Sequence, residues 1–170
     1  MDITFEHDPR GECFARIRRR DGLVLGLPSF SRKFRVPHDL AHAVTERALG
    51  LGGGVFGCIA AGAVFGNMRV LEGKPRHDAK ARSERVLKAA KRSIGVAECL
   101  SGVLHEAVEH GRQLRFSVAR ETWGILEQDP FPYSEREIRS ASEKLHELAE
   151  VWQTSGEPLE FSWPERLRPA

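Results

Sequence analysis

The chain has 170 residues, of which 41% are hydrophobic and 29% are charged, and its formal net charge is +2. This length is typical of one domain that buries its own core, and the composition excludes a disordered or collagen-like chain. The near-neutral balance favours no class of partner. Because no secretory signal pattern opens the sequence and its three cysteines form no C-x-x-C pair, we expect a cytoplasmic protein with reduced thiols.

The first 27 residues predict a small antiparallel sheet. Apolar and polar side chains alternate from Cys13 to Arg20, and Asp21-Gly22 signals a tight hairpin turn. The run Asp8-Pro9-Arg10-Gly11 signals another turn after the apolar residues at positions 3–5. We therefore expect three short strands, followed by a loop over residues 26–35.

Residues 37–66 predict a glycine-rich helical hairpin. Pro37 suits the first position of a helix, Asp39 complements the dipole of its first turn, and the glycines from Gly50 onward end it. A second, apolar helix is expected over residues 55–65. The stretch 48–68 has no charged residue, but seven of its 21 residues are glycine. So high a proportion of glycine argues against a membrane span and favours a buried core helix.

The C-terminal half predicts more helix. Residues 76–110 follow a helical pattern that we expect to be interrupted near Ser93–Gly95, and residues 114–118 suit either a strand or a linker. Ser134 and Glu137 form a capping box for a last helix over residues 134–153. Alternation over residues 158–163 suits a strand that can join the N-terminal sheet.

Together these elements predict one α+β domain over residues 1–170. We expect a small N-terminal antiparallel sheet packed with a bundle of about four helices, and a C-terminal strand that can join the sheet.

The run His38-Asp39-Leu40-Ala41-His42 is the most chemically specific feature of the sequence. Residues four apart on a helix are neighbours, so His38, His42 and Glu46 form a row of two imidazoles and a carboxylate. Such a row suits zinc or another divalent transition metal. The spacing is that of the zinc metalloprotease motif H-E-x-x-H, with Asp39 in the place of the general-base glutamate. The shorter Asp39 side chain would reach a metal-bound water less well, and its expected role is to orient that water.

A second helix offers further ligands. Glu98, His105 and Glu109 share one face of the helix predicted over residues 76–110. If this helix packs beside the His38 helix, ligands from both can meet around one or two metal ions, as in bundle-type carboxylate–histidine sites. The sequence therefore predicts a two-helix metal site and, as its sharper form, a metal-dependent hydrolase.

Three alternatives stay open. The His38 row lies opposite the apolar stripe of its own helix, as an ordinary solvated face does. The basic stretches 16–35 and 74–92 suit a nucleic-acid-binding module, although they lack interleaved aromatic residues. The acidic stretch 121–165 could instead meet the basic ones in a homodimer without enzymatic activity.

Several short segments resemble a group of uncharacterised bacterial proteins whose pattern is P-H-D-L-x-H-x-x-V-E, A-L-G-L, G-x-x-G and A-A-G. The matching segments lie within residues 36–62, and Gly156, Leu159 and Trp163 are similar to the tail of the same pattern. The sequence departs from the pattern at Thr45, where the group has an apolar residue. The resemblance implies a bacterial cytosolic setting and no particular reaction.

Overall fold

The computed structural model of the protein describes residues 1–7, 13–29 and 35–169. Along these residues the elements follow one another as β1 (Asp2–His7), β2 (Cys13–Arg18), β3 (Val24–Pro28), α1 (His38–Leu49), α2 (Val55–Ala60), β4 (Arg69–Glu72), α3 (Ala79–Glu109), α4 (Phe116–Leu126), α5 (Glu135–Ser155) and β5 (Leu159–Ser162). The predicted turn at Asp8–Gly11 and the basic residues Arg32 and Lys33 lie outside the described residues.

The five strands form one antiparallel sheet in the order β4-β3-β2-β1-β5. The central pairs place Ile3 opposite Ile17 and Ile17 opposite Leu25, so one face of the sheet carries a continuous apolar row. β5 pairs with β1, and Phe5 lies opposite Leu159. The predicted α+β class and the C-terminal strand that joins the sheet are confirmed, whereas β4 was not predicted.

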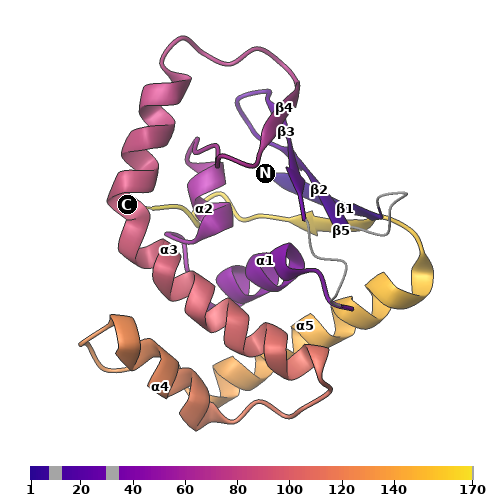
Figure 1. Ribbon diagram of the computed structural model, residues 1–170, viewed down its shortest axis with the longest axis vertical. Coiled ribbons are helices and arrows are strands. Elements are labelled where there is room, and N and C mark those ends of the chain that lie inside the picture. The colour runs from indigo at the N-terminus through magenta and orange to yellow at the C-terminus, as the bar shows by residue number, and fades with distance from the viewer. Residues whose placement is uncertain (8–12, 30–34, 170) are drawn as a thin grey trace.

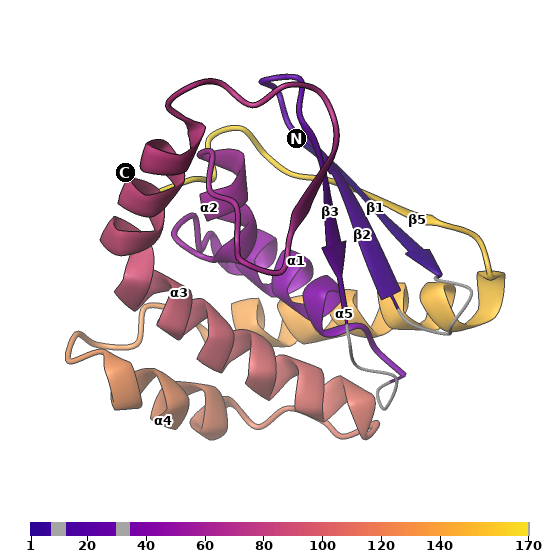
Figure 2. The same cartoon turned by 45° about the horizontal axis from the view of Figure 1, so that its top comes forward.

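Helix α1 is the centre of the molecule. It lies between the sheet and α3, and α5 crosses below it (Figures 1 and 2). α4 lies on the outer side of α3, away from the sheet. The polar side of α1, which could have faced solvent, is therefore covered by a second helix.

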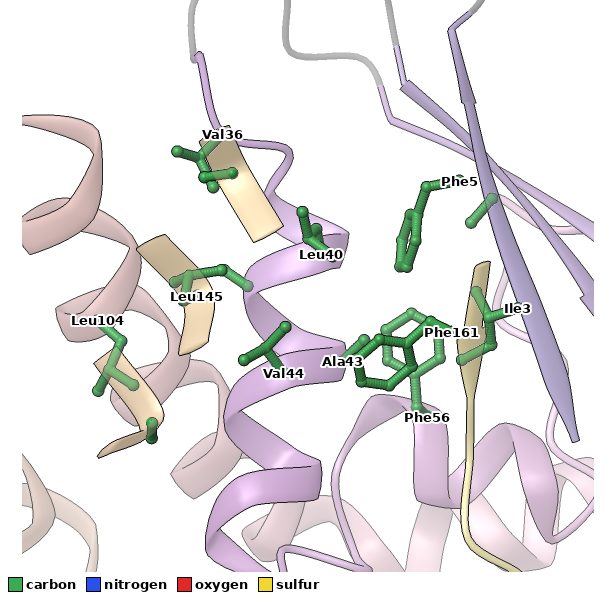
Figure 3. Close-up of a cluster of buried hydrophobic side chains, with 14 of the residues drawn as sticks. Ile3, Phe5, Val36, Leu40, Ala43, Val44, Phe56, Leu104, Leu145 and Phe161 are labelled. Carbon is green, nitrogen blue, oxygen red and sulfur yellow. The ribbon is translucent and has the colours of Figure 1, made fainter. Parts of the chain in front are cut away.

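Figure 3 shows how α1 joins the layers. Leu40 and Ala43 face the sheet residues Phe5 and Phe161, and these side chains are almost completely buried. The buried apolar side chains that surround α1 come from every layer: Ile3, Phe56, Leu104 and Leu145. Because α1 is held on several sides by close packing, the residues at its N-terminal end have fixed positions.

The glycines after α1 allow a tight return of the chain into α2. Gly50 ends α1 in the left-handed region with φ of 70°, which glycine adopts without a steric penalty. A Cβ atom at Gly57 would lie 1.9 Å from the carbonyl oxygen of Gly52, so the two segments approach too closely for any side chain. α2 ends at Ala60, five residues before the predicted end.

The C-terminal half differs from the prediction at two points. α3 is uninterrupted from Ala79 to Glu109, so the predicted break near Ser93–Gly95 is wrong. Ser93 continues the helix, and Gly53 leaves room for its side chain, because a Cβ atom at Gly53 would lie 2.5 Å from that of Ser93. Residues 114–118 were predicted as a strand or a linker, but α4 already begins at Phe116, and this helix packs on α3. In the part of the chain that the structure describes, no helix is both long and apolar enough to cross a membrane.

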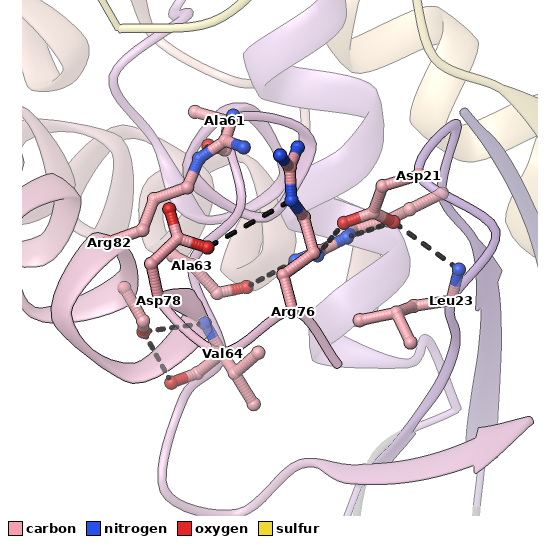
Figure 4. Close-up of polar contacts among 10 residues, drawn as sticks. Asp21, Leu23, Ala61, Ala63, Val64, Arg76, Asp78 and Arg82 are labelled. Atoms are coloured by element: carbon pink, nitrogen blue, oxygen red, sulfur yellow. Dashed lines mark hydrogen bonds and ion pairs between the residues drawn. The ribbon is translucent and has the colours of Figure 1, made fainter. Parts of the chain in front are cut away.

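A polar cluster ties the β2–β3 turn to the start of α3 (Figure 4). The buried Arg19 pairs with Asp21 and donates to the carbonyl oxygen of Ala63 at 3.3 Å. From α3, Arg82 donates to the carbonyl oxygen of Ala61 at 3.0 Å. Basic side chains of both predicted basic stretches thus satisfy backbone carbonyls at the exit of α2.

Candidate metal centre

The structure brings α1 and α3 together at the N-terminal end of α1. Nε2 of His38 lies 3.2 Å from Oε1 of Glu98, and Nε2 of His42 lies 3.0 Å from Oε2 of the same carboxylate. Two residues of α1 and one residue of α3, 56 positions beyond His42 in the chain, therefore converge on one point. This contact between the two predicted helices is the arrangement that the sequence could only suggest.

The three side chains have the geometry of a ligand set. One donor atom from each of His38, His42 and Glu98 lies within 4.8 Å of the other two. A tetrahedral zinc ion with bonds of about 2.0–2.1 Å holds its ligand atoms roughly 3.4 Å apart. Donor atoms as far apart as 4.8 Å would have to move closer together to hold such an ion.

The site is closed on one side and open on the other. The side chain of His42 is only 3% exposed, whereas those of His38 and Glu98 are 35% and 59% exposed. A bound ion would therefore lie near the surface, with His42 on its buried side and His38 and Glu98 at its exposed edge. Catalytic zinc sites use three protein ligands and leave a fourth position for water or substrate.

Glu46 fixes the orientation of His42 from behind. Its carboxylate Oε1 accepts a hydrogen bond from Nδ1 of His42 at 3.0 Å. The fully buried Glu46 also accepts from the backbone N–H groups of Val55 at 2.8 Å and Phe56 at 3.0 Å. A carboxylate on one imidazole nitrogen leaves the other nitrogen directed at the metal position and raises its basicity. The structure thus places Glu46, which the sequence suggested as a ligand, behind His42 and outside the group of converging donor atoms.

Gly54 makes room for the Glu46 carboxylate. A Cβ atom at Gly54 would lie 2.3 Å from the carboxyl carbon of Glu46. The backbone of Gly54, with φ of −77°, is one that any residue adopts, so only this contact requires glycine. From the sequence, the triple glycine was predicted to end the helix and to argue against a membrane span, and no contact with Glu46 was predicted. A carboxylate on the preceding helix was the signal that could have shown this further role.

Charge is concentrated at the site. Burial alone would lower the pKa of His42, but hydrogen bonds to Glu46 and Glu98 and their negative charges raise it to about 9. Hydrogen bonds from His38 and His42 hold the pKa of Glu98 well below its usual range. Burial raises the pKa of the Asp39 carboxyl to about 6, and the two histidines partly oppose this rise. A cation bound among these carboxylates would balance their negative charge, as the proton on His42 does in its absence.

His105 and Glu109 lie beside the site, but their side chains form hydrogen bonds with the backbone of residues 35–36. Nε2 of His105 lies 2.8 Å from the carbonyl oxygen of Val36, and its ring packs edge-on to His38. Glu109 accepts from the backbone N–H groups of Arg35 and Val36, both at 2.9 Å. In the part of the chain that the structure describes, three of the six suggested ligands, His38, His42 and Glu98, form the group of converging donor atoms. His105 and Glu109 instead hold the backbone segment that leads into His38.

The alternative of a solvated polar row is wrong for two of its three members. His42 is 2% exposed and Glu46 is 0% exposed, because α3 and the glycine turn cover them. Two imidazoles and two carboxylates are therefore concentrated at an interface between helices.

Several residues of the basic stretches form ion pairs with acidic residues of the same chain. Arg16 forms ion pairs with Glu6 and Glu72, and Arg92 pairs with Glu127. Together with the pairing of Arg19 described above, these contacts give the stretches a structural role. Binding of nucleic acid and formation of a homodimer stay predictions that no contact of the described residues favours.

Comparison of the chain with protein-family models, with curated proteins and with solved structures finds no match.

Proposed function

We propose that the protein binds one divalent transition metal ion, with zinc as the preferred ion, through His38, His42 and Glu98. The observation that carries the proposal is the convergence of three donor atoms within 4.8 Å from two helices. The hydrogen bond from His42 to Glu46 supports it, because metal-binding histidines almost always donate their second ring nitrogen to a carboxylate or carbonyl.

The chemistry that this arrangement supports best is hydrolysis of an ester or amide. A zinc ion lowers the pKa of a bound water to about 7. Asp39, next to His38 in the first turn of α1, would accept the proton of such a water and pass it to the leaving group. The water oxygen would then replace the alcohol or amine on the carbonyl carbon, so that one bond forms as the other breaks. Exposure of His38 and Glu98 would give a substrate access to the ion.

Metal content measured by elemental analysis tests the binding step. The purified wild-type chain, expressed with zinc and iron supplied, should carry zinc, and both His42→Ala and Glu98→Ala should lose it. His146→Ala is the matched control, because His146 also pairs with a glutamate four residues on but lies exposed on α5. Equal metal content in all four proteins would contradict the assignment, and a preference for iron would identify the site as a facial triad.

Hydrolysis is tested separately from binding. Zinc-loaded wild type should hydrolyse p-nitrophenyl acetate faster than the zinc-free protein. Asp39→Asn should keep its zinc and lose the rate by about 10²-fold or more, as loss of a general base does. An unchanged rate in Asp39→Asn at equal zinc content would remove Asp39 from the mechanism while leaving the metal site in place.

A further inference from the structure

An open groove runs along α3 next to the metal ligand Glu98. Its volume is about 420 Å³, and it lies between α3, the segment that follows α3 and the start of α4. Glu98 lines the groove together with the apolar residues Cys99, Val103, Leu114 and Val118, and the polar side chains of Glu106, Arg112, Gln113 and Arg115 line it as well. α4 lies beside the C-terminal half of α3, on the side away from the sheet (Figures 1 and 2). The groove is therefore a surface feature that begins at the metal centre.

Gly102 lies on the surface between the groove and the metal centre. It is four residues after Glu98 on α3, hence on the same face, and it also lines the groove. Glycine is among the least favourable residues in the interior of a helix. A Cβ atom at Gly102 would meet no atom within 4 Å, in contrast to Gly53, Gly54 and Gly57, where close neighbours require glycine.

Packing among the described residues therefore does not account for Gly102. Its missing side chain leaves open space over α3, directly beside Glu98. A molecule bound to the metal through a carbonyl group could extend across this space into the groove. The apolar residues beyond it, Val103, Leu114 and Val118, would cover a hydrocarbon group.

We propose that this groove binds the apolar arm of the substrate, whose hydrolysable carbonyl lies at the metal. The substrate class is then an ester or amide of an acid with a hydrophobic chain or side group, and Gly102 determines access for that group. The inference rests on the proposed metal site and extends it to substrate choice.

Alkyl hydroxamates test the groove without any turnover. Hydroxamates bind a metal ion through two oxygens, so acetohydroxamate measures the metal alone and longer chains measure the metal together with the groove. Each fully buried methylene strengthens binding by about fourfold. Octanohydroxamate should bind the zinc-loaded protein at least ~50-fold more tightly than acetohydroxamate, which corresponds to about three buried methylenes.

Gly102→Leu should fill the space. The octanohydroxamate advantage should fall below about threefold, while the Kd of acetohydroxamate stays within about twofold of wild type. Gly124→Leu on α4 is the matched control, since a Cβ atom there also meets nothing within 4 Å and Gly124 does not line the groove. Gly102→Ala adds only one methyl group and favours the helix, so this variant should fold. It gives a second measurement of how far a side chain at this position reduces the dependence of affinity on chain length.

The outcomes are separable. Equal affinity for the two hydroxamates in wild type, or an advantage that Gly102→Leu leaves intact, overturns the groove proposal while the metal site stands. Absence of zinc-dependent acetohydroxamate binding shows that the metal site itself is wrong, and the groove proposal falls with it. A branched 4-methylpentanohydroxamate that binds more tightly per carbon than the linear chain would identify an amino-acid-like side group, and the reverse order a fatty acyl chain.

Discussion

His42 donates a hydrogen bond from Nδ1 to the carboxylate of Glu46, one helical turn further along α1, and both side chains are buried. The same carboxylate accepts from the first two backbone N–H groups of α2. The orientation of His42 is thus coupled to the glycine turn through a single buried side chain. This coupling distinguishes the site from a chance pair of histidines on a helix surface.

Replacement of Glu46 by Gln should weaken metal binding by about 10–100-fold, the usual effect of losing a carboxylate partner of a metal-bound histidine. Zinc affinity is measured by competition with a chelator. Glu137→Gln is the control, because Glu137 also accepts a backbone hydrogen bond, from Ser134 in the exposed capping box of α5. An equal loss in both variants would indicate a general effect of fold stability.

Gly54→Ala should displace the Glu46 carboxylate, because its Cβ would lie within 2.6 Å of all three carboxyl atoms. We expect a loss of zinc affinity similar to that of Glu46→Gln and a loss of about 1–3 kcal/mol in the free energy of unfolding, typical of an overpacked core. Gly66→Ala, where a Cβ atom meets nothing within 4 Å, is the matched substitution. If chemical denaturation and chelator competition show no difference between the two variants, the close approach of Gly54 to Glu46 contributes neither to stability nor to metal affinity.

The metal-free protein should lose stability as the pH rises. The folded-state pKa of His42 is about 9, above its ordinary value of 6.5. The folded state therefore binds this proton more tightly than the unfolded state, and the stabilisation is complete below pH 6.5 and lost as the pH rises through 9. Its size is on the order of 3 kcal/mol, since one pKa unit corresponds to about 1.4 kcal/mol.

Thermal unfolding of the chelator-treated protein across this pH range measures the effect. His42→Asn should show a flatter profile, whereas His146→Ala should keep the slope of wild type. A slope that persists unchanged in His42→Asn would assign the pH dependence to other groups.

Thr45→Val should stabilise the protein. Thr45 is completely buried on α1, and its hydroxyl has no hydrogen-bond partner among the described residues. A buried hydroxyl without a partner costs about 1–3 kcal/mol, so its replacement by a methyl group should raise the free energy of unfolding by about 1 kcal/mol. The midpoint of urea unfolding reports this change. A decrease of the midpoint would show that the hydroxyl has a bonding role that the described contacts lack.

Much of the fold could be predicted from local patterns. The alternation after Cys13, the capping box at Ser134 and the glycines after Leu49 each act within a few residues, and the elements they predict are present in the structure. β4 and α4 were missed because their short apolar segments acquire their form from neighbours: β4 from pairing with β3, and α4 from packing on α3.

The candidate site could be predicted in its composition but not in the roles of its residues. Helical spacing placed His38 and His42 in one row and Glu98 on the matching face of a distant helix. The burial of His42 could not be seen from its own helix, because α3 covers that side only in the tertiary structure. The position of Glu46 behind His42 likewise depends on the backbone amides of Val55 and Phe56, which approach it through the glycine turn.

Metal stoichiometry of the purified protein, with zinc measured by elemental analysis, tests the central claim most directly. The two-helix ligand set predicts about one zinc ion per chain in wild type and almost none in Glu98→Ala, in which both histidines remain but the ligand from α3 is gone. Less than about 0.2 zinc per chain in wild type after zinc-supplemented expression, or an unchanged content in Glu98→Ala, would contradict it.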